Sequence, residues 1–158
     1  MTVLPRRKKN RLQDYNYSQN GAYFITICTK DRKKIFGDIV GAAICRPHIK
    51  LSTIGESIAN TIENISKIYQ CVTVDKYVVM PNHVHMIIVI NDNGRQVAAP
   101  TVNTIVGNMK RHVSMQAGFS LWQKSFHDHI IRDEANYLKI AEYIENTPIT
   151  WNDDCFYV

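Results

Sequence analysis

The sequence predicts an α+β domain with a ferredoxin-like split βαβ sheet and one additional helix at its C-terminal end. The main observation is the order of patterned segments: strand, helix, strand, strand, helix, strand, and then a further helix. The second observation is size and composition. A chain of 158 residues that is 45% hydrophobic and 21% charged suffices for one domain with a proper core.

The first half of the chain is expected to hold one strand and one helix. Residues Ala22–Thr29 alternate as a half-buried strand does, and an exposed basic turn over residues 30–34 follows. The stretch up to Lys50 shows no regular period. Ser52 is a suitable N-cap for a helix that runs to Tyr69, because isoleucines then recur at helical spacing.

The second half is expected to hold three strands and two helices. Val72–Met80 and His83–Ile90 are apolar strands joined through Pro81-Asn82, whose turn chemistry favours a tight antiparallel connection. Apolar residues at helical spacing mark a helix over residues 102–113, and Ser125–Ile131 is expected to be the last strand. A final helix over residues 133–146 ends before Pro148.

The segment Asn82-His83-Val84-His85 is the most informative motif. Alternate residues of a strand project from one face, so His83 and His85 point the same way while Val84 points into the core. Two imidazoles on a rigid strand form half of a divalent-metal site. The alternative is a strand with two polar residues on its solvent face. In the predicted topology this strand is central, and the last helix is free to cover the face of the histidines.

The last predicted helix carries a tyrosine on its polar side. Its apolar side is formed by Tyr137, Ile140, Ala141 and Ile144. Its polar side is formed by Asn136, Lys139, Tyr143, Asn146 and Thr147. A tyrosine in this place is either an amphipathic ring at the helix margin or part of a functional site.

The net charge and the cysteine pattern indicate which partners and which cellular location to expect. The net charge is +5, and much of it falls in a basic arm, residues 1–16, ahead of a single domain over residues 17–158. Such an arm either contacts a polyanion or is a solvated terminus. No secretory signal or membrane span is apparent, so a cytoplasmic location is expected. The four cysteines lack metal or redox spacing and are interpreted as free structural thiols.

Three motifs in order resemble the single-tyrosine HUH transposases, which include insertion-sequence and REP-associated tyrosine transposases. Residues 80–85 are similar to the family's His-hydrophobic-His strand, residues 122–134 to the segment before its last helix, and residues 143–148 to its nucleophile helix. The resemblance extends from about Tyr15 to Trp151.

This resemblance implies a transposase that cuts and rejoins single-stranded DNA near hairpin-forming ends, with Tyr143 as the nucleophile. His83 and His85 are then ligands of Mg²⁺ or Mn²⁺, and a His pair suits manganese better. The implied product is a 5′-phosphotyrosine and a free 3′-hydroxyl. Lys139, one turn before Tyr143, either stabilises the phenolate or phosphate or is a solvated helix lysine. Relatives include dimers, so a homodimer in which Tyr143 acts on the partner's histidines stays open.

One position departs from the family pattern. Relatives carry Asn or Gln one turn after the tyrosine as a third metal ligand, and Thr147 stands there in this chain. Asn146 is adjacent in sequence but about 100° round the helix. Thr147 and Asn146 are therefore both candidates for the third ligand.

Several assignments have alternatives. Trp122 and Phe126 either stack on DNA bases or pack in the core, and His127 and His129 are expected to make structural hydrogen bonds. Three classes of protein stay open. The first is a transposase, the second a domesticated module that binds DNA or RNA hairpins without cutting them, and the third a metal-dependent hydrolase of small phosphoesters. The expected DNA-binding residues are Arg6, Arg7, Lys8, Lys9, Arg11, Lys33, Lys34, Lys110 and Arg111.

Overall fold

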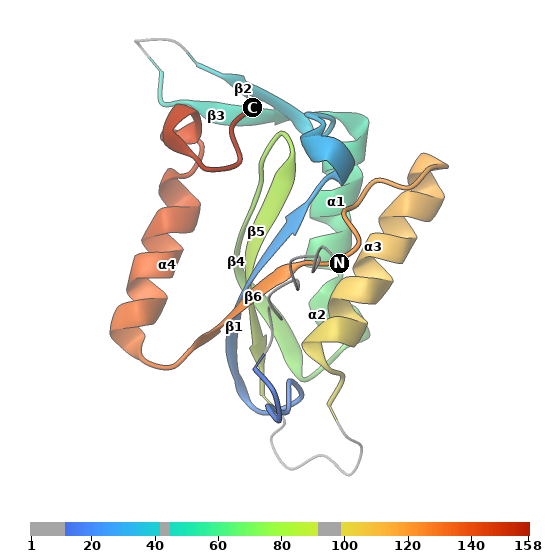
Figure 1. Cartoon of the computed structure of the whole chain (residues 1–158), viewed down its shortest axis with the longest axis vertical. Helices are drawn as coiled ribbons and strands as arrows, with labels where there is room; N and C mark the ends of the chain where they lie inside the picture. Colours follow the sequence, from blue (N-terminus) through green and yellow to red (C-terminus); the bar gives the residue numbers. More distant parts are fainter. Residues whose placement is uncertain (1–11, 42–44, 92–98) are drawn as a thin grey trace, which may run out of the picture.

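A four-stranded antiparallel sheet forms the centre of the computed structural model, which describes residues 12–41, 45–91 and 99–158 (Figure 1). The strand order is β4-β5-β1-β6, and β5 lies between β4 and β1. This is the order of the split βαβ motif, so the fold prediction is confirmed. The strands are β1 (Gly21–Cys28), β4 (Val72–Val79), β5 (His83–Ile90) and β6 (His127–Ile131).

Helices cover both faces of the sheet. Val84, Met86 and Ile88 of β5 point into the main core with α1 and α3, whereas Ile87 points to the opposite face, which α4 covers (Figure 1). The alternation of a strand thus divides the molecule into two layers of packing. The helices are α1 (Thr53–Glu63), α2 (Ile65–Ile68), α3 (Val102–Ala117) and α4 (Glu134–Asn146).

Two details differ from the predicted elements. The single helix expected up to Tyr69 is two helices, because Asn64 ends α1 and its side-chain amide donates to the carbonyl of Asn60 at 2.8 Å. The stretch expected to be irregular contains a hairpin of β2 (Gly37–Val40) and β3 (His48–Leu51). These strands are short and only partly buried, so they lack the hydrophobic alternation that marks a strand in a sequence.

Helix α4 is held on the sheet by apolar packing and by polar contacts at its edges. Ala141 and Ile144 are buried against Ile87 and Ile131. Full burial of an isoleucine side chain such as that of Ile144 contributes about 1.5–3 kcal/mol. The ion pair of Glu145 with Lys76 of β4 is exposed to solvent, which screens it, so it contributes little. The apolar contacts therefore determine where the helix lies over β5.

The four cysteines form no disulfide. Cys28 and Cys71 are buried, while Cys45 and Cys155 are exposed. The interpretation as structural thiols thus suits the two buried residues. In the part of the chain that the structure describes, no helix combines the length and the apolar character that crossing a membrane requires.

Candidate active site

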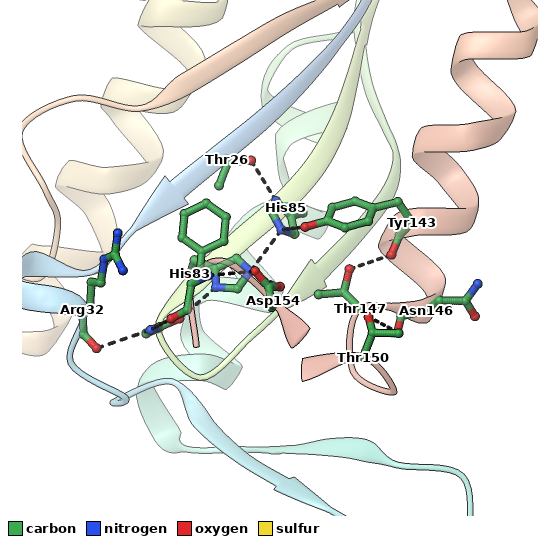
Figure 2. Close-up of polar contacts among 11 residues, drawn as sticks. Thr26, Arg32, His83, His85, Tyr143, Asn146, Thr147, Thr150 and Asp154 are labelled. Atoms are coloured by element: carbon green, nitrogen blue, oxygen red, sulfur yellow. Dashed lines mark hydrogen bonds and ion pairs between the residues drawn. The ribbon is translucent and has the colours of Figure 1, made fainter. Parts of the chain in front are cut away.

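The centre of the candidate site is the histidine pair of β5. His83 and His85 lie on one face of the sheet, as predicted, with their Nε2 atoms 3.0 Å apart (Figure 2). Both residues are at most 1% exposed. They face away from the main core that holds Val84, and they are nevertheless buried because aromatic rings of the C-terminal segment enclose them.

Each ring is oriented by a hydrogen-bond partner behind it. The Nδ1 atom of His83 is 2.8 Å from Oδ1 of Asn82, and the Nδ1 atom of His85 is 2.8 Å from Oγ1 of Thr26. Thr26 lies directly opposite His85 on β1. Such partners leave the Nε2 atoms to face the site, as in histidines that bind metals.

The C-terminal segment, residues 147–158, supplies the cover and one further polar group. The ring of Phe156 lies 4.5 Å from the ring of His83, and the ring of Trp151, in the short helix η2 (Trp151–Asp153), stacks on His83 at 5.9 Å. The side chain of Asp154 is 2% exposed, and its Oδ2 atom lies 3.7 Å from Nε2 of His83. Asp154 was not among the residues predicted from the sequence. The signal that could have identified it is a carboxylate within a segment rich in aromatic residues.

The three side chains fit a divalent metal ion. Oδ2 of Asp154 is buried without a hydrogen-bond partner, and the three candidate ligand atoms lie within 4.8 Å of one another. The 3.0 Å between the Nε2 atoms is close to the separation of about 2.9 Å between neighbouring ligands of an octahedral ion bound at 2.0–2.1 Å. Two imidazoles and one carboxylate favour manganese or another transition ion over magnesium.

Both imidazoles are neutral at neutral pH. Burial, together with the neighbouring His85, lowers the pKa of His83 to about 2, and burial lowers the pKa of His85 to about 3. The contact of His83 with Asp154 is therefore not an ion pair. The neutral imidazole is the form that binds metals, so the pair is ready for an ion without losing a proton.

These pKa values predict that the metal-free protein loses stability in mild acid. Below about pH 6.5 the histidines take up protons in the unfolded chain, whereas in the folded protein they stay neutral down to pH 2–3. We expect each histidine to contribute a loss of about 2 kcal/mol in unfolding free energy between pH 7 and pH 5. Urea unfolding at both pH values with a chelator present measures this loss. The His83→Gln variant should lose about half as much, and an equal loss in both proteins would contradict the prediction.

Tyr143 extends from α4 toward the histidine pair (Figure 2). Its hydroxyl lies 3.3 Å from Nε2 of His85, and the two ring centroids are 5.2 Å apart. The residue is 40% exposed, so the hydroxyl sits between the buried site and solvent. Partial burial, followed by the negative charges of Asp154 and Cys155, raises the pKa of Tyr143 to about 12. The hydroxyl thus keeps its proton at neutral pH.

The three other predicted site residues of α4 lie in different surroundings. Thr147 is fully buried, and its hydroxyl donates to the carbonyl of Tyr143 at 2.6 Å (Figure 2). Asn146 points away from the histidines, and its Oδ1 accepts from Arg46 at 3.4 Å. Lys139 is exposed one turn before Tyr143. Of these three, Thr147 is the buried one, and its hydroxyl is bonded to the backbone carbonyl one helical turn earlier.

The expected DNA-binding residues fall in three places. Those of the basic arm lie outside the described residues. Lys33 and Lys34 are exposed, and Nζ of Lys34 lies 5.0 Å from the ring centroid of Tyr157 in the C-terminal segment. Lys110 and Arg111 lie on α3, on the other side of the sheet. Lys110 is half-buried, donates to the carbonyl of Gln123 at 2.7 Å, and has a pKa lowered by burial.

The aromatic and histidine candidates of the segment before α4 are mostly structural. Trp122 and Phe126 are 7% and 8% exposed and belong to the main core, and the indole of Trp122 donates to the carbonyl of Lys110. His127 and His129 are exposed on β6, and His129 lies 3.2 Å from Oδ1 of Asn136. Core packing thus accounts for both aromatic residues.

A sheet of this order with a tyrosine-bearing helix on one face is the fold of the tyrosine transposases. A solved structure of a REP-associated tyrosine transposase bound to a REP hairpin matches it with a TM-score of 0.66 at 17% identity, over 89% of this chain and 74% of that one. The family described as "Transposase IS200 like" matches residues 17–147, so the chain belongs to the IS200-like transposases, a family of DNA-processing enzymes. An uncharacterized protein of Haemophilus influenzae is 35% identical over 173 aligned residues, which cover 96% of this chain and 93% of that protein.

Proposed function

We propose that this transposase cleaves and rejoins single-stranded DNA next to hairpin-forming ends through a covalent bond to Tyr143. The observation that carries the proposal is the convergence of the Tyr143 hydroxyl, two imidazole Nε2 atoms and the Asp154 carboxylate in one small space. A structural relative is bound to a REP hairpin, which supports hairpin DNA as the substrate class.

The chemistry assigns one role to each group. Tyr143 Oη forms a bond to phosphorus while the bond from phosphorus to the 3′-oxygen breaks. One DNA end is then joined to the protein as a 5′-phosphotyrosine, and the other end carries a free 3′-hydroxyl. The tyrosine loses one proton, and the leaving oxygen gains one. A bound divalent ion, held by His83, His85 and Asp154, would make phosphorus more electrophilic and stabilise the developing charge. This help is needed because ionising even an ordinary tyrosine at neutral pH costs about 4 kcal/mol.

We propose that Tyr143 acts on the histidines of its own subunit. Helix α4 is fixed to the sheet of the same chain by Ala141 and Ile144, and this packing brings the Tyr143 hydroxyl to 3.3 Å from His85. One chain therefore supplies every group that the proposal needs. A homodimer is compatible with this arrangement but is not required to complete it.

We propose Asp154 as the third protein ligand. Asp154→Asn should weaken Mn²⁺ binding about 10-fold or more and slow cleavage, because an amide oxygen without negative charge replaces a carboxylate. Calorimetric titration with Mn²⁺ and a cleavage assay measure the two effects. Asp153→Asn, the same change one residue earlier at an exposed position, is the matched control. Faster cleavage with unchanged Mn²⁺ affinity would show instead that Asp154 obstructs the site.

The basic arm is proposed to contact DNA phosphates. Deleting residues 1–11 removes five cations, and each lost phosphate contact should lower the slope of log affinity against log salt by about 0.7 for single strands. Binding of a single-stranded hairpin substrate at several salt concentrations measures this slope. Cleavage at saturating DNA should change little. An unaltered slope would show that the arm is a solvated terminus that makes no contact with DNA phosphates.

The decisive experiment for the proposed function is detection of the covalent intermediate. The full-length protein is incubated with Mn²⁺ and single-stranded DNA that carries a hairpin and a labelled 3′ flank. We expect a labelled protein–DNA adduct that withstands denaturation and disappears when a chelator is added first. Hairpin binding without any adduct would favour the non-cleaving binding module instead.

A further inference from the structure

The side chain of Asn82 connects three segments of the chain at the candidate metal site. It lies between β4 and β5 and is 1% exposed. Its Oδ1 atom is 2.8 Å from Nδ1 of His83, and its amide nitrogen donates to the carbonyl of Phe156 at 2.8 Å. The same nitrogen lies 3.4 Å from the carbonyl of Arg32.

These partners determine which way the amide points. A backbone carbonyl can only accept a hydrogen bond, so the NH₂ end of Asn82 must face Phe156 and Arg32. Its carbonyl oxygen then faces Nδ1 of His83 and can only accept, so this ring nitrogen must carry the proton. The lone pair of His83 is consequently on Nε2, which faces His85 and Asp154.

The second partner of Asn82 leads to the third ligand. Phe156 accepts from Asn82 through its carbonyl and donates through its backbone N–H to Oδ1 of Asp154 at 2.9 Å. The amide of Asn82 is therefore joined to Asp154 through one residue. The other carboxylate oxygen of Asp154, Oδ2, is left to face the histidines.

We infer that Asn82 is a positioning residue of the metal site that sets two ligands at once. It holds His83 in the tautomer whose Nε2 can bind an ion, and it holds the segment that carries Asp154 against the site. This inference rests on the proposed function, because it takes His83 and Asp154 to be ligands.

The turn between the two strands does not depend on this side chain. The backbone carbonyl of Asn82 accepts from the backbone N–H of Thr29 at 2.9 Å and from its hydroxyl at 3.1 Å. The backbone N–H of Met80 also donates to the carbonyl of His83 at 2.8 Å. These bonds persist when the side chain is shortened, so a variant should keep the strand connection while it loses the links to His83 and Phe156.

Two substitutions separate the two roles. Asn82→Ala removes both links, whereas Asn82→Asp keeps the acceptor for His83 and loses the donor for Phe156. Asn60→Asp makes the same chemical change at an exposed position of α1, on the opposite face of the sheet, and is the matched control.

The tautomer is read in metal-free protein from long-range ¹H–¹⁵N spectra of the histidine rings. We expect His83 to carry its proton on Nδ1 in wild type, in Asn82→Asp and in Asn60→Asp, and to show a mixture of tautomers in Asn82→Ala. Hydrogen exchange of residues 148–158 should be faster in both Asn82 variants and unchanged in Asn60→Asp. Mn²⁺ affinity of Asn82→Ala should fall about 10- to 100-fold, as is usual when the partner of a metal-binding histidine is removed.

The outcomes distinguish this inference from the proposed function. Absence of Mn²⁺ binding in the wild-type protein would contradict the proposed metal site itself. Wild-type Mn²⁺ binding with an unchanged affinity and tautomer in Asn82→Ala would overturn the role of Asn82 alone. If Asn82→Ala does not fold, Asn82→Asp decides, because a proton on Nε2 of His83 or an unchanged exchange rate in that variant contradicts the inference.

Discussion

Tyr143→Phe should abolish the covalent protein–DNA adduct while hairpin affinity stays within about two-fold. Only the nucleophilic oxygen is removed, and the phenyl ring keeps its contacts with His85 and Phe24. Because the residue is 40% exposed, its change in unfolding free energy should stay within about 0.5 kcal/mol. Adduct formation on labelled single-stranded DNA and equilibrium binding to the hairpin measure the two effects.

Tyr137→Phe is the matched control on the same helix. The hydroxyl of Tyr137 donates to Asp75 of β4 and points to the sheet edge rather than to the histidines. This variant should form the adduct with wild-type yield. An adduct that persists in Tyr143→Phe and vanishes in Tyr137→Phe would move the nucleophile to Tyr137.

A mixture of two inactive variants tests whether the tyrosine acts within its own subunit. Tyr143→Phe lacks the nucleophile, and His85→Ala lacks a proposed metal ligand. Since the structure places both groups of one chain 3.3 Å apart, the mixture should form no adduct. Restored cleavage would show that Tyr143 reaches the histidines of a partner subunit.

His83→Ala and His85→Ala should each slow cleavage by at least about 100-fold and weaken Mn²⁺ binding. A pair of imidazoles at 3.0 Å cannot hold an ion in the same way once one nitrogen is lost. Single-turnover cleavage and calorimetry measure these losses. Unchanged Mn²⁺ binding in both variants would end the interpretation of the pair as a metal site.

The same substitutions should also destabilise the fold. Each removes a side chain that is at most 1% exposed and leaves Oδ1 of Asn82 or the hydroxyl of Thr26 without its partner. A buried polar group without a partner costs about 1–3 kcal/mol. Melting curves must therefore accompany the activity assays. His112→Ala, at an exposed position of α3 on the other side of the sheet, is the control that should change neither stability nor Mn²⁺ affinity appreciably.

The elements that were predicted correctly are those with a strong local pattern. The alternation of β1, the apolar run of β5 and the helical spacing in α1 and α3 depend on which residues face the main core, and burial imposes this period on the sequence. Pro81-Asn82 predicted the tight turn for the same local reason. The hairpin of β2 and β3 was missed because it is short and only half-buried, so it carries little periodic signal.

The histidine pair and Tyr143 could be picked out from the sequence because a strand and a helix determine which residues share a face. The sequence by itself therefore determined the sheet order, the shared face of His83 and His85, and the helix that carries Tyr143. Only the tertiary structure decided that Asp154 joins them, because an irregular C-terminal segment has no period and its path depends on Trp151 and Phe156 packing on His83. The burial of His83 and His85 likewise depends on contacts with residues about 70 positions later in the chain, and no local sequence pattern indicates such contacts.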